Sequence, residues 1–170
     1  VISRMLLKTI ESVNKPALAG LWPNKKNMNV VLDLGANVEC DEKNLIDFSE
    51  MGAALYKALF PEDTPRVALL NIGSEEIKGT EILKKAYVKL KHISTNGDFE
   101  FKGFIEGNKI TNGESNVIVT DGFTGNVALK TAEGTAKFIT DSLKKSLSST
   151  LLSKFSVIFS YFALKKFKEK

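Results

Sequence analysis

Cysteine and histidine are nearly absent from this sequence of 170 residues, which holds one of each, Cys40 and His92. One cysteine excludes a disulfide within the chain, and a zinc site built from cysteine and histidine is not expected either. No Gly-x-Ser-x-Gly motif is present, so a Ser-His-Asp triad is not expected. Acidic neighbours raise the pKa of a thiol, and we do not expect Cys40 to act as a nucleophile. The sequence therefore predicts no metal and no cofactor.

Long hydrophobic runs are also missing. No uncharged apolar stretch reaches the length of about 18 residues that an ordinary transmembrane helix needs. Charged residues occur throughout positions 1–15, unlike a secretory signal peptide, and we expect a cytoplasmic protein. The chain begins at Val1 with the apolar stripe of a helix over 2–13, but no N-cap precedes it. We therefore expect a piece of a longer protein.

Positive charge is concentrated at one end of the chain. The formal net charge is +4, but residues 137–170 carry eight lysines against Asp141 and Glu169, which leaves the other 136 residues slightly acidic. A nucleic-acid-binding protein more often carries its basic face on the folded body, so we expect no nucleic-acid partner. The chain is predicted to consist of a folded body at 1–136 and a basic tail at 137–170.

The tail has the pattern of an amphipathic helix pair. Apolar residues recur mostly every four positions between lysines, and we predict membrane contacts at Leu151, Phe155, Phe159 and Phe162. Three poor helix formers at 148–150 predict a break there, which gives either a second helix at 151–167 or one bent helix. Packing against a second copy of the chain is the alternative, and the two functions are compatible.

Strand and helix patterns alternate along the body. Strands are predicted at 17–21, 29–34, 66–71, 98–105 and 116–120, with a polar loop at 22–29 after the first. Helices are predicted at 41–59, where Asp41 is the expected N-cap, at 80–93, and from about 125 to 147. The runs NVVLDL and RVALLN do not alternate with polar residues, which is typical of strands covered on both faces. This order predicts an α/β domain with a mostly parallel, Rossmann-like sheet flanked by helices.

Three polar segments stand at the ends of predicted strands, where open α/β sheets bind ligands. They are 33–37 (DLGAN), 71–75 (NIGSE) and 121–126 (DGFTGN). Glycine lets the backbone approach a ligand, and the N–H groups of a helix start face an anion. Tight turns and helix caps are the alternative explanation. The predicted binding residues are Asp33, Gly35, Asn71, Gly73, Gly79, Asp121, Gly122, Gly125, Asn126 and Lys130.

With these segments the sequence resembles the acyl-carrier-protein:phosphate acyltransferases of bacterial phospholipid synthesis. The matching stretches lie at 32–37, 66–81 and 121–131, in the family's order and spacing, and the basic tail resembles the family's paired amphipathic helices. The resemblance implies a parallel-sheet fold related to phosphotransacetylases and isocitrate-type dehydrogenases. It also implies a homodimer that touches the membrane peripherally.

The resemblance further implies a reaction. A fatty acyl group passes from acyl carrier protein to inorganic phosphate, and a membrane glycerol-3-phosphate acyltransferase uses the acyl phosphate. We predict catalytic roles for Lys78, Asn37 and Glu75: Lys78 holds phosphate as a point charge, Asn37 donates a hydrogen bond, and Glu75 accepts a proton or orients Lys78. Asp33 and Asp121 are expected to fix loop geometry, because their charges repel phosphate.

Two alternatives stay open. One is a short-chain phosphotransacylase that uses coenzyme A, and the other is a non-catalytic fragment that keeps only dimer and membrane contacts. The second is suggested by departures from the family pattern, such as Asn108 where the family usually has arginine. A nicotinamide dehydrogenase is disfavoured, since the motif G-x-G-x-x-G is missing.

Overall fold

The computed structural model describes residues 13–95, 98–150, 160 and 165. The chain divides into two compact units, Val1–Leu129 and Lys130–Lys170, so the division falls N-terminal to the predicted boundary after residue 136. The predicted helix at 2–13 lies outside the described residues except for Val13, and the one at 151–167 except for the helical residues Ser160 and Lys165. The four predicted membrane contacts, Leu151, Phe155, Phe159 and Phe162, also lie outside them.

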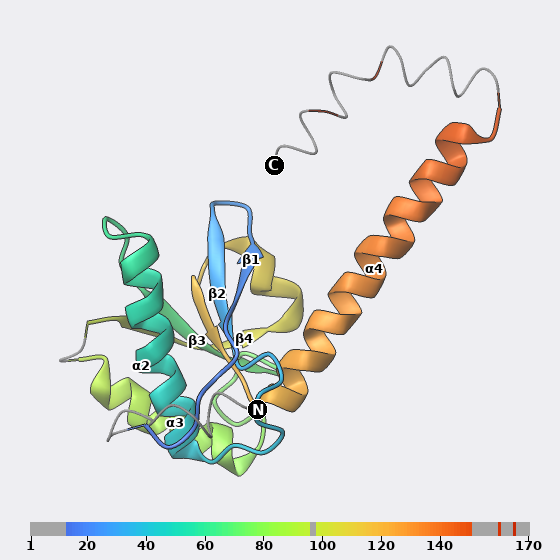
Figure 1. The fold of residues 1–170 in the computed structure, drawn as a ribbon. Helices are drawn as coiled ribbons and strands as arrows, with labels where there is room; N and C mark the ends of the chain where they lie inside the picture. The colour runs from blue at the N-terminus through green and yellow to red at the C-terminus, as the bar shows by residue number, and fades with distance from the viewer. Residues whose placement is uncertain (1–12, 96–97, 151–159, 161–164, 166–170) are drawn as a thin grey trace, which may run out of the picture. The chain divides into compact units, whose positions relative to one another are not determined.

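The first unit is built on a sheet of five described strands (Figure 1). The strands are β1 (Gly20–Pro23), β2 (Met28–Leu32), β3 (Arg66–Asn71), β4 (Glu100–Glu106) and β5 (Val117–Val119), in the order β1-β2-β5-β3-β4. β2, β5, β3 and β4 run parallel, and β1 is an antiparallel edge strand. The predicted α/β fold with a mostly parallel sheet is therefore confirmed.

Two helices lie side by side against the sheet, and each begins one residue after its predicted first residue, which is the N-cap. α2 (Glu42–Leu59) is capped by Asp41, whose carboxylate accepts from Asn44 N at 2.8 Å while Asn44 Oδ1 accepts from Asp41 N at 3.1 Å. α3 (Glu81–Ile93) is capped by Thr80, whose hydroxyl accepts from Leu83 N at 3.3 Å. A 3₁₀ helix, η1 (Gly107–Asn112), connects β4 to β5. These caps stabilise the N-terminal ends of both helices, which lie at the carboxyl edge of the sheet.

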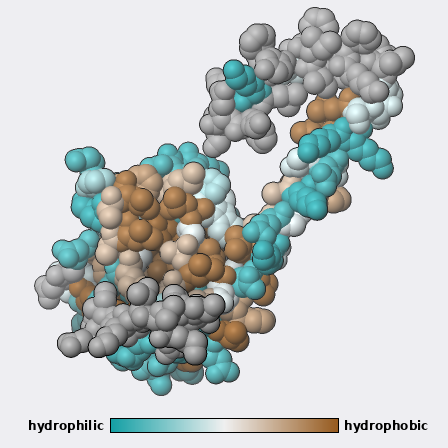
Figure 2. Space-filling model, in the orientation of Figure 1, coloured by the Kyte–Doolittle hydropathy of each residue, from teal (hydrophilic) through white to brown (hydrophobic). Residues whose placement is uncertain are grey.

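Both faces of the parallel strands are buried. Val30, Val67 and Val117 belong to a core that includes Phe48 and Tyr56 of α2. Their neighbours along the strands face the other way and form a second core with Ile110, comprising Val31, Leu34, Ala68, Leu70, Ile105 and Ile118. The strands lack an apolar–polar alternation because each face has its own core. Figure 2 shows that hydrophobic surface also remains on the α/β unit in this view, flanked by hydrophilic residues.

Several predicted boundaries differ from the structure. The segment at 22–29, predicted as a polar loop, contains the end of β1 and the start of β2, and β1 lies later than the predicted strand at 17–21. The turn between them is short because Asn24 Oδ1 accepts from Lys26 N at 2.7 Å and from Asn27 N at 2.8 Å. The last described long helix, α4 (Gly122–Ser148), begins three residues earlier than predicted because Asp121 caps it. Its end at Ser148 agrees with the predicted break.

Candidate functional site

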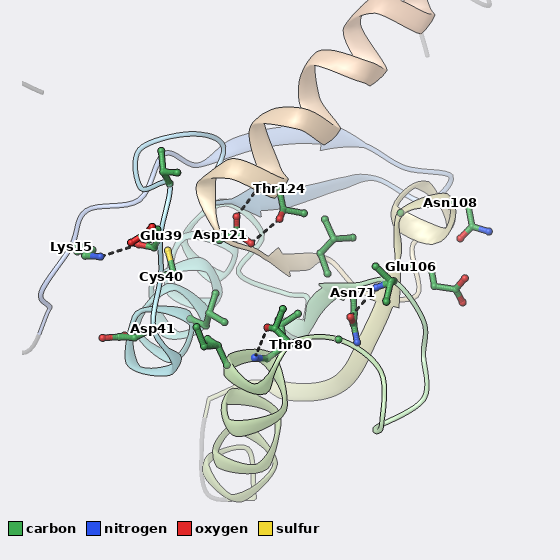
Figure 3. A pocket seen from close by; sticks show the side chains of 18 residues that line it. Lys15, Glu39, Cys40, Asp41, Asn71, Thr80, Glu106, Asn108, Asp121 and Thr124 are labelled. Atoms are coloured by element: carbon green, nitrogen blue, oxygen red, sulfur yellow. Dashed lines mark hydrogen bonds between the residues drawn. The ribbon is translucent and has the colours of Figure 1, made fainter.

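A cavity of about 1050 Å³ opens at the carboxyl edge of the parallel strands (Figure 3). Its wall is formed by the segments that follow β2, β3, β4 and β5, together with the first turns of α2 and α3. The polar lining groups, seen as sticks in Figure 3, include Asn71, Glu106 and Asp121. Four consecutive strand ends thus meet at one place, as expected for a ligand site in an open α/β sheet.

The first and third predicted segments interlock beside this cavity. The buried Asp33 carboxylate accepts five hydrogen bonds of 2.7–3.2 Å, from Leu18 N, Gly35 N, Ala36 N, and the backbone N and side-chain Nδ2 of Asn37. Asn37 O in turn accepts from Gly122 N at 2.8 Å. A side chain on Gly125 has no room, because its Cβ coincides with the Asp33 carbonyl. These contacts rigidly join the loop after β2 to the start of α4.

The Asn71 side chain closes the loop that contains the second predicted segment, 71–75. Asn71 Oδ1 accepts from Ile72 N at 2.8 Å, and Asn71 Nδ2 donates to Lys78 O at 3.1 Å. Gly79, at φ +89°, allows this closure because a Cβ there collides with the Asn71 amide. Inside the loop, the side chains of Glu75 and Lys78 both lie against Gly73. The loop also reaches α3, where the Tyr87 hydroxyl donates to Glu76 Oε1 at 2.6 Å.

The structure places the predicted site residues in three groups. Asn71, Gly79 and Asp121 line the cavity. Ten others do not appear among its described lining residues. Three of these lie on the loop after β3, where Lys78 and Glu75 are exposed beside Gly73. Six more belong to the joined segments after β2 and β5: Asp33, Gly35, Asn37, Gly122, Gly125 and Asn126. The tenth, Lys130, belongs to the second unit, where it pairs with Glu133 at 2.8 Å.

Both amide protons of the Asn37 side chain are engaged by neighbouring groups. Its Nδ2 donates to Pro16 O and to Asp33 Oδ2, both at 2.7 Å, so its two protons are used. Asp121 is engaged in a similar way, since its carboxylate accepts from the backbone N of Thr124 at 2.8 Å and from its hydroxyl at 2.7 Å. Both groups hold the backbone that surrounds the cavity.

Several lining residues were not selected from the sequence. Glu106, Gly107 and Asn108 follow β4, and Thr80 and Thr124 stand at helix starts. The first three carry the same signal as the predicted segments, a glycine with polar neighbours after a buried strand. The two threonines stand beside predicted residues.

The charge of the lining is predominantly negative. Its described residues include four acids, Glu39, Asp41, Glu106 and Asp121, and one lysine, Lys15, which donates to Glu39 O at 3.0 Å. Just outside the lining, Lys109 binds Glu106 at 3.0 Å, and this hydrogen bond and charge raise the pKa of Lys109. The cavity wall itself therefore disfavours a bound anion, while the Lys109 ammonium group lies beside it, paired with Glu106.

The thiol of Cys40 also faces this cavity but is not activated. Partial burial is the main cause that raises its pKa, and the charges of Asp33 and Asp121 add to the effect. The predicted direction is confirmed, although burial outweighs the acidic neighbours. Among the described residues, we find no group of three potential metal ligands and no helix long and apolar enough to cross a bilayer.

Comparison with known proteins assigns the chain more precisely. A family model described as "Fatty acid synthesis protein" matches residues 1–170. A phosphate acyltransferase from Pelagibacter ubique is 63% identical over 170 residues, which are 100% of this chain and 51% of that protein. Phosphate acyltransferases from Albidiferax ferrireducens (48% identity, 94% of this chain, 46% of that protein) and Brucella canis (43%, 99% and 49%) are similar. The chain thus spans about half the length of these relatives.

A solved structure supports the fold. The chain superposes on EutD phosphotransacetylase from Staphylococcus aureus with a TM-score of 0.58, covering 79% of this chain and 46% of that one. The two sequences are 16% identical, so this similarity concerns the fold.

Proposed function

Because this chain belongs to the fatty acid synthesis protein family, we propose that it forms part of an enzyme that transfers a fatty acyl group to inorganic phosphate. Relatives that are 43–63% identical are named phosphate acyltransferase, which supports this activity. The acyl donor is the thioester of acyl carrier protein, and the acyl phosphate enters phospholipid synthesis. The observation that carries the proposal is the cavity, where four strand ends of this sequence meet.

The chemistry needs little from the protein beyond positioning. A phosphate oxygen attacks the thioester carbonyl, the new C–O bond forms, the C–S bond breaks, and the thiolate leaves and takes up a proton. Phosphate is already nucleophilic at neutral pH, so the step requires no covalent enzyme intermediate. The site must hold the dianion against the carbonyl and provide donors for the developing oxyanion.

Lys78 is the side chain that we assign to phosphate. It is exposed on the loop after β3, against Gly73, and this loop continues directly into the cavity-lining residues Gly79 and Thr80. In this proposal its ammonium group reaches the border of the cavity, where it offsets the acidic wall. Glu75 lies against the same glycine and orients Lys78. Asn37 acts by positioning, because both protons of its amide are bound by Pro16 O and Asp33 Oδ2.

An assay of acyl phosphate formation tests the proposal. The chain is incubated with labelled phosphate and either acyl carrier protein or coenzyme A thioesters. We expect Lys78→Ala to lower turnover at least tenfold, which corresponds to about 1.4 kcal/mol. Lys85→Ala, an exposed lysine on α3, is the matched control and should leave turnover unchanged. Equal turnover of both variants removes Lys78 from the site.

The same assay separates the two alternatives. Product from coenzyme A thioesters but not from acyl carrier protein indicates a short-chain phosphotransacylase. No product from either donor indicates a non-catalytic fragment.

We further propose a cytoplasmic homodimer that binds the membrane surface through its basic tail. The proposal is supported by the eight lysines of residues 137–170 and the apolar residues between them. Sedimentation equilibrium tests the dimer, since a monomer at micromolar concentration contradicts it.

A further inference from the structure

Three exposed aliphatic side chains from separate segments line the cavity. Val38, after β2, is 70% exposed; Ile72, after β3, is 83% exposed; and Ile82, in the first turn of α3, is 40% exposed. Single exposed aliphatic residues are ordinary on a protein surface. Three that line one cavity, together with the lining residues Leu45, Leu70 and Leu83, give it an aliphatic wall of the kind that marks a ligand site.

The charges of the cavity restrict what can occupy this wall. Four acids and one lysine line it, so a phosphate dianion or a free carboxylate is repelled. A neutral hydrocarbon chain carries no charge for these acids to repel, and it gains by covering the aliphatic residues. The volume of about 1050 Å³ lies at the upper end of ligand pockets and is far more than an acetyl group needs.

We propose that Val38, Ile72 and Ile82 form the subsite for the acyl chain, and that Ile72 and Ile82 determine its preferred length. The proposal rests on the proposed function, because that function supplies the acyl group. It divides the site into two parts. The acyl chain lies along the aliphatic wall, and phosphate lies at the border beside Lys78, so the thioester carbonyl stands between them.

The loop after β3 connects the two parts. Ile72 and Lys78 stand at its two ends, and the Asn71 side chain holds these ends together through Ile72 N and Lys78 O. A chain that contacts Ile72 therefore lies against the same closed loop whose backbone carries Lys78. This arrangement makes the position of the reacting carbonyl depend on how the acyl chain fills the wall.

Binding of neutral acyl thioesters to the full chain tests the subsite without phosphate. Acetyl, octanoyl, dodecanoyl and hexadecanoyl thioesters of N-acetylcysteamine are titrated calorimetrically, below their micelle concentrations. We expect affinity to rise by roughly fourfold for each added methylene that is buried, until the wall is filled. Ile72→Glu and Ile82→Glu should weaken dodecanoyl binding at least tenfold and leave acetyl binding unchanged.

The chain offers a matched control for each variant. Ile77 lies on the same loop as Ile72 and is 80% exposed, and Val88 lies on α3 with Ile82 and is 58% exposed, but neither is among the described lining residues. Ile77→Glu and Val88→Glu add the same charge and should bind like the original chain. Ile82→Trp should shift the best-bound chain to a shorter one, an effect that loss of structure does not produce.

The outcomes are distinct. Failure of the original chain to bind long-chain thioesters, or equal weakening by Ile72→Glu and Ile77→Glu, overturns the subsite. An unchanged length preference in Ile82→Trp removes its role in specificity. Chain-length-dependent binding without acyl phosphate formation in the turnover assay supports the subsite and contradicts the proposed reaction, so the two proposals fail separately.

Discussion

Asp33 binds Asn37 twice, because Asp33 Oδ2 accepts from the Asn37 backbone N at 2.8 Å and from its Nδ2 at 2.7 Å. The other carboxylate oxygen, Oδ1, accepts from Leu18 N, Gly35 N and Ala36 N. The fully buried carboxylate thereby organises the whole loop after β2 and, through Asn37 O, the start of α4. The expectation that this acid serves loop geometry agrees with these contacts.

Asp33→Asn should therefore destabilise the protein. The new amide nitrogen is a donor that faces backbone donors, so hydrogen bonds to a charged acceptor are lost and buried N–H groups remain unpaired. We expect a loss of about 2–4 kcal/mol in the free energy of unfolding, measured by urea denaturation with an unchanged m-value. Asp121→Asn is the control, since asparagine also caps helices well, and it should cost only a few tenths of a kcal/mol. Similar losses for both variants contradict the role of Asp33.

A second prediction concerns the acidic side of the pH–stability curve. The Tyr56 hydroxyl donates to Asp63 Oδ2 at 2.7 Å, and this hydrogen bond, aided by Arg66, lowers the pKa of Asp63 to about 2 from an ordinary 3.8. Between these two pKa values the Asp63 carboxyl is therefore protonated in the unfolded chain and ionised in the folded chain. Stability that is present above pH 3.8 should be lost as the pH falls through about 2.

The same pair also affects stability at alkaline pH, where stability falls as the pH rises. Burial and the hydrogen bond to Asp63 raise the pKa of Tyr56 to about 12 from 10, so the unfolded chain releases its proton first and stability falls as the pH rises from 10 to 12. Tyr56→Phe should make the free energy of unfolding depend less on pH on both the acidic and the alkaline side. Urea denaturation at each pH measures this. Part of the alkaline fall should remain, because the pKa of Tyr87 is also raised to about 12, chiefly by its hydrogen bond to Glu76. An unchanged acid limb in Tyr56→Phe contradicts the coupling.

The sequence was most informative where a short local signal decides the structure. Arg66–Asn71 is the observed β3 and also the predicted strand, because Pro65 and Gly73 delimit an apolar run. Asp41 was predicted to cap α2 and does so. β1 was misplaced because its position depends on pairing with β2, where Gly20 stands opposite Val31, and single residues do not encode that register.

The position of the cavity could be predicted from the sequence, but most of the residues that line it could not. Strand ends after buried runs identified the edge of the sheet, but a strand end does not reveal which side chains turn into the cavity. Asn37 is the example, since its amide turns toward Pro16 and Asp33. The aliphatic wall was missed because Val38, Ile72 and Ile82 have no period or motif, and only the fold brings them together.

Two glycines of α4 should respond oppositely to the same substitution. In Gly125→Ala the new methyl meets the Asp33 carbonyl, so the backbone must shift, and we expect a loss of about 2–3 kcal/mol. At Gly134 a Cβ meets no heavy atom of the described residues within 4 Å. Gly134→Ala should stabilise the helix by about 0.5–1 kcal/mol, because alanine is the better helix former. Thermal unfolding followed by far-ultraviolet circular dichroism measures both, and a harmless Gly125→Ala contradicts the close approach.

The last prediction concerns the basic tail and the membrane. Lysines near an anionic surface contribute roughly 1 kcal/mol each before screening, and the apolar residues add about 25 cal/mol for each Å² that they bury. Phe159→Glu combined with Phe162→Glu removes the apolar part and adds two negative charges, so sedimentation with anionic vesicles should be abolished. Ser156→Glu combined with Ser160→Glu adds the same charges at polar positions and should retain measurable binding. Circular dichroism checks that both variants stay folded. Equal binding of the original chain to neutral and anionic vesicles, or persistent binding of the phenylalanine variant, assigns these residues to packing between copies of the chain instead.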